Sequence, residues 1–154
     1  MMPPQRTRRD ARQSERGSSL VEFALAFSML FTIFAGAYEF GYAFFMYNQL
    51  ETAVRDGARY SSFRTYDSAS CTPSAGFQTA VKNTVLYGNP DGGAKPVIPG
   101  LTAANITLTP TCSGGLPAAF TVSITNYRLR TMFLTATLNK PAATFPYVGV
   151  YAPI

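Results

Sequence analysis

The pattern of apolar and polar residues divides this chain into three parts, with changes near residues 20 and 60. No charged residue occurs between Phe23 and Tyr38, and the apolar character continues as far as Tyr47. From Leu50 to Ala58 the apolar residues recur at helical spacing, and polar residues occupy the opposite face. This pattern predicts a long apolar helix that continues as an amphipathic one.

The apolar run has the length of a membrane span. Glu39 follows Glu22 by 17 residues, which is about 25 Å of helix at 1.5 Å per residue and is close to the ~30 Å hydrocarbon core of a bilayer. Three tyrosines, whose rings favour the headgroup layer, gather toward its later end: Tyr38, Tyr42 and Tyr47. We expect one transmembrane helix that extends beyond the membrane, from Ser18 to about Ser62.

The positive charge of the chain is concentrated before this helix. The net charge is +5, and five arginines precede Gly17: Arg6, Arg8, Arg9, Arg12 and Arg16. A basic segment before an apolar span predicts a cytoplasmic N-terminus. No second basic cluster with interleaved aromatic residues follows, and Arg128 and Arg130 fit a solvated strand edge, so nucleic acid is not an expected partner.

A secretory signal peptide is the alternative interpretation of the same segment, with a cut after Ala35-Gly36-Ala37. Two features disfavour it. Glu22 lies inside the apolar run, and the run is longer than the 7–15 residues that are usual for such peptides.

The remainder, from residue 63, predicts a small α+β head. Phe77 to Tyr87 has the spacing of a short helix, with Ser74 as a candidate cap. Alternating apolar and polar residues predict an antiparallel sheet with strands at 105–109 and 120–125, and a weaker candidate at 144–150. The segment 132–138 is a strand or loop, and we expect it to pack in the core unless it contacts another subunit.

Candidate chemistry is sparse. The chain contains no His, no cysteine pair at metal spacing and no phosphate-binding loop, so we expect no catalytic, metal or cofactor residues and no enzyme activity. Cys71 and Cys112 both follow the apolar run, where an oxidising compartment favours a disulfide between them. The alternative is two buried free thiols.

Two sequence blocks carry a resemblance to a known family. The first is Gly17-Ser18-Ser19-Leu20-Val21-Glu22-Phe23. The second is Tyr38-Glu39-Phe40-Gly41, followed by Asn48-Gln49-Leu50 and Ala53-Val54-Arg55-Asp56-Gly57-Ala58-Arg59-Tyr60. Together they resemble the TadE-like pseudopilins, the minor pilins of tight-adherence (Flp-type) type IV pilus systems.

The resemblance implies a processing step and an assembly role. A prepilin peptidase would cut between Gly17 and Ser18, which leaves Glu22 at the fifth mature position. Glu22 would then meet the Ser18 amine of a neighbouring subunit. The implied domains are a cytoplasmic leader (1–17), a membrane and stalk helix (18–62) and an exported head (63–154), and the implied partners are the inner membrane, the peptidase, other pilin-like subunits and the assembly platform.

Two alternatives remain open at this point. Ser19 to Glu22 also spells a helix capping box, which would make Glu22 an ordinary residue of a helix start. The whole chain is also compatible with a membrane-anchored periplasmic binding or adhesion domain that joins no filament.

Overall fold

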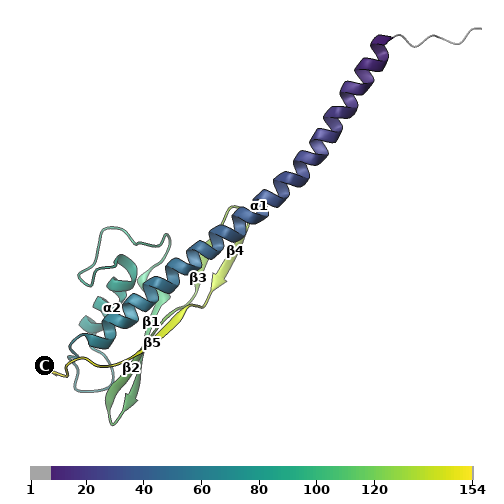
Figure 1. Cartoon of the computed structure of the whole chain (residues 1–154). Coiled ribbons are helices and arrows are strands. Elements are labelled where there is room, and N and C mark those ends of the chain that lie inside the picture. Colours follow the sequence, from purple (N-terminus) through teal and green to yellow (C-terminus); the bar gives the residue numbers. More distant parts are fainter. Residues whose placement is uncertain (1–7, 154) are drawn as a thin grey trace, which may run out of the picture. The chain divides into compact units, whose positions relative to one another are not determined.

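The computed structural model describes the backbone of residues 8–153 and the side chains of residues 17–153 (Figure 1). The elements are α1 (Arg8–Phe63), α2 (Ala75–Tyr87), a short 3-10 turn η1 (Ala103–Asn105), β1 (Ile106–Ser113), β2 (Leu116–Ile124), β3 (Tyr127–Arg130), β4 (Thr135–Leu138) and β5 (Ala142–Pro146). One long apolar helix is followed by a short helix and small antiparallel sheets. This confirms the predicted α+β class.

The chain forms two compact units, which meet in sequence between Gly41 and Tyr42 inside α1. The first unit contains only helix within its described residues. The second contains the rest of α1 and every other element. The domain limits expected at residues 17 and 62 stay predictions, since they concern processing and export rather than compactness.

The limits of α1 differ from the expected ones at one end. The helix ends at Phe63, one residue beyond the predicted Ser62, but it begins at Arg8 rather than at Ser18. Ser19 therefore lies well inside the helix and does not cap it. The capping-box interpretation of Glu22 is wrong, because a cap satisfies backbone N–H groups that only a helix start leaves unpaired.

The second helix forms as its sequence predicts. Ser74 is the N-cap: its hydroxyl accepts a hydrogen bond from the Phe77 N–H at 3.0 Å. The same hydroxyl donates to Asp67 Oδ2 at 2.7 Å, which ties the cap to the segment after α1. Gly88 ends the helix with a φ of 70°, a left-handed conformation that glycine adopts without steric cost.

Two antiparallel sheets complete the second unit. One has the order β1-β2-β5 with β2 in the centre, and the other is the hairpin of β3 and β4. Strand β2 alternates as expected, with Phe120, Val122 and Ile124 fully buried. The predicted strands at 105–109 and 120–125 are confirmed in position, although both are longer than predicted.

Two expectations for the later strands are wrong. The candidate at 144–150 begins and ends earlier, as β5, because beyond Pro146 the chain leaves the sheet and the Val148 N–H donates to Ser62 O at 2.8 Å. In the segment 132–138 only Thr135–Leu138 is a strand. Met132, Phe133 and Leu134 do not pack in the core, since they are 73, 65 and 60% exposed.

The core of the second unit joins both helices to the central strand. Leu50, Val54 and Ala58 of α1 are fully buried at four-residue spacing. They pack in one cluster with residues of α2 and β2, whose largest members are Phe77 and Phe120. The two phenylalanine rings lie 5.2 Å apart between centroids.

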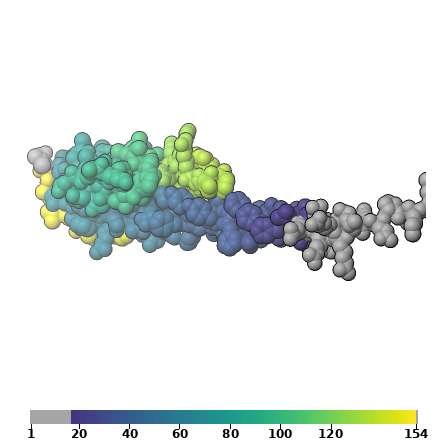
Figure 2. Space-filling view, turned by 90° about the horizontal axis from the view of Figure 1, so that it is seen from above, coloured from purple at the N-terminus to yellow at the C-terminus, as the bar shows by residue number. Residues whose placement is uncertain are grey.

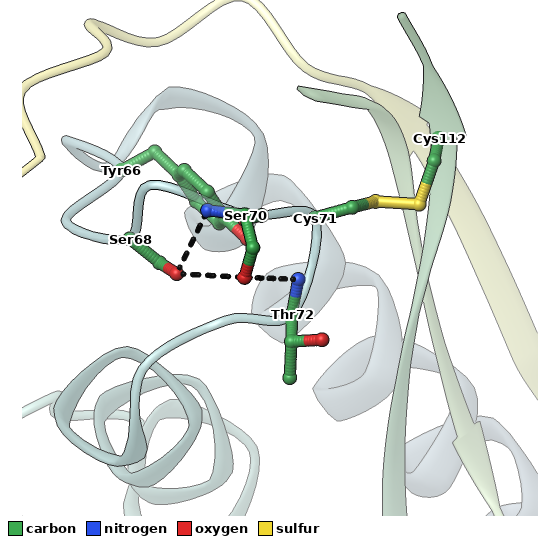
Figure 3. The surroundings of a disulfide bond; sticks show 6 residues. All are labelled: Tyr66, Ser68, Ser70, Cys71, Thr72 and Cys112. Carbon is green, nitrogen blue, oxygen red and sulfur yellow. Dashed lines mark hydrogen bonds between the residues drawn. A yellow bond between two sulfur atoms is a disulfide. The ribbon is translucent and has the colours of Figure 1, made fainter. Parts of the chain in front are cut away.

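A disulfide between Cys71 and Cys112 connects the segment after α1 to the end of β1 (Figure 3). The turn before Cys71 is held by Ser70, whose backbone carbonyl accepts from the Tyr66 hydroxyl at 2.7 Å. The Ser68 hydroxyl accepts from the Ser70 N–H at 3.3 Å, and both serines appear beside the bond in Figure 3. The predicted disulfide is confirmed, and the free-thiol alternative is wrong.

Loss of the disulfide should destabilise the second unit strongly. Closing a loop with a sequence separation of 41 residues stabilises a fold by about 4 kcal/mol through the entropy of the unfolded chain. We expect the Cys71→Ser, Cys112→Ser double variant, in detergent, to unfold at clearly lower urea concentration. Reductant should shift the wild type to the same midpoint and leave the double variant unchanged. Equal midpoints for oxidised and reduced wild type would contradict the prediction.

Candidate functional site: the N-terminal helix and its sequence blocks

The early part of α1 is an apolar surface that no described residue of its own unit covers. Large apolar side chains from Leu20 to Phe40 are more than half exposed, among them Leu20, Phe23, Leu25, Phe27, Met29, Phe31, Ile33, Phe34 and Phe40. Within the described residues, one helix segment, Gly17–Phe63, is long and apolar enough to cross a membrane. Exposure of such a surface to lipid carries none of the free-energy cost that its exposure to water would carry.

The polar side chains in this stretch are compatible with lipid. The Ser28 hydroxyl donates to Ala24 O, and the Thr32 hydroxyl donates to Ser28 O, both at 2.8 Å. Each hydroxyl therefore satisfies its donor on the preceding turn of its own helix. No unsatisfied hydroxyl donor from these two residues would face the hydrocarbon.

Gly17, Ser18 and Glu22 lie on exposed helix. A Cβ at Gly17 would meet no atom within 4 Å, so packing in the described chain does not require glycine there. Gly17 lies within the helix and not before it. A protease that cuts here must unwind the helix locally, and a glycine lowers the cost of doing so by about 1 kcal/mol relative to alanine.

Glu22 follows Ser18 by four residues, which places both on one face of the helix. Among the side chains of residues 17–153, Glu22 has no ion-pair partner. The next residue begins a ladder of phenylalanines at four-residue spacing. Phe23 stacks on Phe27 at 6.0 Å between centroids, and Phe27 stacks on Phe31 at 6.2 Å.

The block around Glu39 is also mostly exposed. Phe40 is 76% exposed, and a Cβ at Gly41 would meet no atom within 4 Å. Glu39 is half-buried and takes part in interactions within the chain. Packing among the described residues therefore does not explain a glycine at position 41.

The last block, by contrast, is largely explained by packing in the second unit. A Cβ built at Gly57 would overlap the Cγ2 methyl of Val85 in α2, so α1 and α2 approach each other too closely for any other residue. Ala58 beside it is fully buried. The helical spacing of Phe77, Val81 and Val85 predicted an apolar face for α2, but no sequence signal indicated that this face meets Gly57.

The charged residues of this block lie on its outer face. Arg55 pairs with Glu51 one turn earlier, as its spacing predicts, and because both side chains are more than a third exposed the pair contributes a few tenths of a kcal/mol. Arg59 is exposed. Tyr60 is half-buried, and its hydroxyl accepts a hydrogen bond from Arg64.

No arrangement in the described part of the chain offers a metal site. Within that part, no group of three or more His, Cys, Asp or Glu side chains lies close enough together to hold an ion.

Burial raises the pKa of the Tyr66, Tyr127 and Tyr147 hydroxyls, which keeps these groups neutral hydrogen-bond donors inside the second unit.

The geometry thus defines a class of protein: a single apolar helix able to span a membrane, followed by a small disulfide-bonded α+β unit. A family model of TadE-like proteins matches residues 17–59. The match confirms the resemblance predicted from the two sequence blocks. It ends at Arg59, so the α+β elements beyond α1 lie outside it.

No curated protein and no solved structure matches the chain.

Replacing Gly57 should loosen the contact between α1 and α2. Gly57→Ala adds a methyl group against the stiff, fully packed Val85 side chain, and we expect a loss of about 1–3 kcal/mol in the free energy of unfolding. Gly76→Ala in α2 is the matched control, because its Cβ meets only the Ser74 hydroxyl oxygen at 3.8 Å. Urea unfolding of both variants in detergent measures the difference, and equal stability of the two would contradict the predicted clash.

Proposed function

We propose that this chain is a minor pilin, or pseudopilin, of a Tad (Flp-type) pilus assembly or secretion system. It is inserted in the inner membrane through α1, processed after Gly17 by a prepilin peptidase and assembled with other pilin-like subunits through the same helix. The observation that carries this proposal is Glu22. It is an exposed carboxylate at the edge of an apolar surface, inside the segment that matches TadE-like proteins.

The proposed processing explains the order of charge and apolar sequence. The arginine-rich leader before Gly17 keeps the N-terminus in the cytoplasm and the head in the periplasm or the pilus. A cut between Gly17 and Ser18 removes this leader and creates a new amine at the membrane surface. The mature chain then consists of the helix through about residue 62 and the head at 63–154.

The proposed assembly step is driven by charge neutralisation in lipid. A carboxylate at the bilayer centre costs about 2.5–3.5 kcal/mol, and less near the surface. The Ser18 amine lies one helical turn from Glu22 of its own chain, but a neighbouring subunit offset along the helix axis can bring its own amine to Glu22. Only the pair between neighbours links neutralisation to assembly.

The surface of the apolar helix supports lateral packing. Phe23, Phe27 and Phe31 stack in a row along the helix and form a regular row of apolar side chains. Gly36 and Gly41 have open space around them, so a neighbouring helix can approach closely at these two positions. The assembly platform would contact the same helix as the subunit leaves the membrane.

The proposed cut predicts the mature N-terminus. Intact-mass measurement of protein extracted from the native membrane should give a chain that begins at Ser18. Gly17→Val should leave the leader attached, whereas Gly36→Ala, a change at a second helical glycine in open space, should be processed normally. A mature chain that begins after Ala37 would instead indicate a signal peptide, and an intact leader in the wild type would indicate an anchored domain.

The proposed pairing predicts the effect of removing one charge. Glu22→Gln keeps the size of the side chain but not its charge, so the variant should insert at the wild-type level and lose most assembled pili. Glu51→Gln is the control, because this carboxylate has only an exposed pair with Arg55. Membrane fractionation measures insertion, and shearing followed by quantification of released pilus protein measures assembly. Wild-type pilus levels in Glu22→Gln would contradict the proposed pair between Glu22 and the Ser18 amine of a neighbour.

A further inference from the structure

The turn between β3 and β4 displays three large apolar side chains to solvent. Met132, Phe133 and Leu134 are each exposed by 60% or more. The turn itself is fixed by hydrogen bonds at its base: the Thr131 N–H donates to Leu134 O at 2.9 Å, and the Leu134 N–H donates to the Thr131 hydroxyl at 3.1 Å. The apolar tip, defined as Met132 to Leu134, is therefore an ordered turn whose side chains are largely exposed.

The two strands below the apolar tip orient it. Tyr127 and Leu129 of β3 are buried against the core, and the alternate residues Arg128 and Arg130 are exposed. Two guanidinium groups thus lie on the strand that leads directly to the apolar tip. No Asp or Glu occurs in the sequence after Asp91, so the arginines have no acidic partner from this part of the chain.

The hairpin lies at the end of the second unit that contains its first residue, Tyr42. Arg130 and Leu129 line one cavity with Tyr42 and Met46 of α1. Tyr42 is the first residue of the unit, and the chain continues from it without a break into the exposed apolar segment that ends at Gly41. In Figure 2 the yellow-green hairpin and the yellow C-terminal segment occupy opposite ends of this unit.

The composition of this surface matches the interfacial layer of a membrane. Apolar side chains beside arginines are typical of segments that lie at the boundary of headgroups and acyl chains, where the cations bind anionic phosphates. Tyr42, which lines the same cavity as Leu129 and Arg130, lies three residues beyond Glu39 and belongs to the predicted aromatic belt. A surface for a soluble partner would not need to lie where the chain enters its membrane segment.

We propose that the β3–β4 hairpin is a second membrane contact: the apolar tip enters the interfacial layer of the bilayer that holds α1, and Arg128 and Arg130 bind anionic lipid headgroups. The contact fixes how the second unit faces the membrane before assembly. A subunit that leaves the bilayer must withdraw the hairpin as well as the helix. The proposal rests on membrane insertion of α1 and not on the filament role, so the two fail in different experiments.

The absence of tryptophan from the sequence makes a direct test possible. Phe133→Trp places one tryptophan at the apolar tip. Leu116→Trp is the matched control, since Leu116 is 41% exposed and is the first residue of β2, directly after the turn that joins β1 to β2. That turn lies at the other end of the second unit from the β3–β4 hairpin (Figure 1). Each full-length variant is reconstituted in phosphatidylcholine vesicles that contain phosphatidylglycerol, with lipids brominated at shallow acyl positions as quenchers.

We expect at least twofold stronger bromine quenching of Phe133→Trp than of Leu116→Trp. Equal quenching of the two variants would overturn the proposal. Shielding of the tryptophan that depends on the protein-to-lipid ratio and not on bromine would also overturn it, because a second copy of the chain would then cover the apolar tip.

The headgroup contact is tested separately. Arg128→Gln with Arg130→Gln, in the Phe133→Trp background, should reduce quenching in anionic vesicles to the level seen in pure phosphatidylcholine. High salt should have the same effect, since it screens the attraction between arginine and phosphate. Unchanged quenching in the double variant would contradict a role of the arginines, and matching circular dichroism spectra confirm that the variants are folded.

Discussion

The close approach of α1 and α2 at Gly57 is the contact on which the second unit depends. Because Gly57 has no side chain, the Val85 methyl lies directly against the backbone of α1, and Ala58 beside it is fully buried. This spacing lets Leu50 and Val54 share one core with Phe77 and the central strand. A larger residue at 57 would separate the two helices and open the core that they enclose.

One helix serves two environments. Through Gly41 its apolar side chains are exposed, as in lipid, and its hydroxyls bond to its own backbone. From Tyr42 onward it is amphipathic, with one face buried at four-residue spacing and the other carrying pairs such as that of Glu51 with Arg55. The family match at residues 17–59 covers both parts, which explains why its residues divide into two kinds. Gly57 and Ala58 build the core, whereas Gly41 has open space around it.

The difference between residues that pack in the core and residues that are exposed bears on function. Residues that pack within the subunit explain how the second unit is built, but they need no partner. Glu22, the phenylalanine ladder and Gly41 present chemistry that only lipid or another helix can use. The apolar tip of the β3–β4 hairpin is also exposed, and it lies outside the matched segment.

The sequence by itself determined the local elements. The apolar run, the cap at Ser74 and the alternation of 120–125 predicted α1, α2 and β2, because helix and strand periods and capping hydrogen bonds are properties of short segments. It also determined the resemblance at Gly17 to Phe23 and at Tyr38 to Tyr60. Only the tertiary structure decided which side chains meet across the chain. Val85 against Gly57, and the exposure of Met132 to Leu134, depend on how separate elements pack, and no local pattern records that packing.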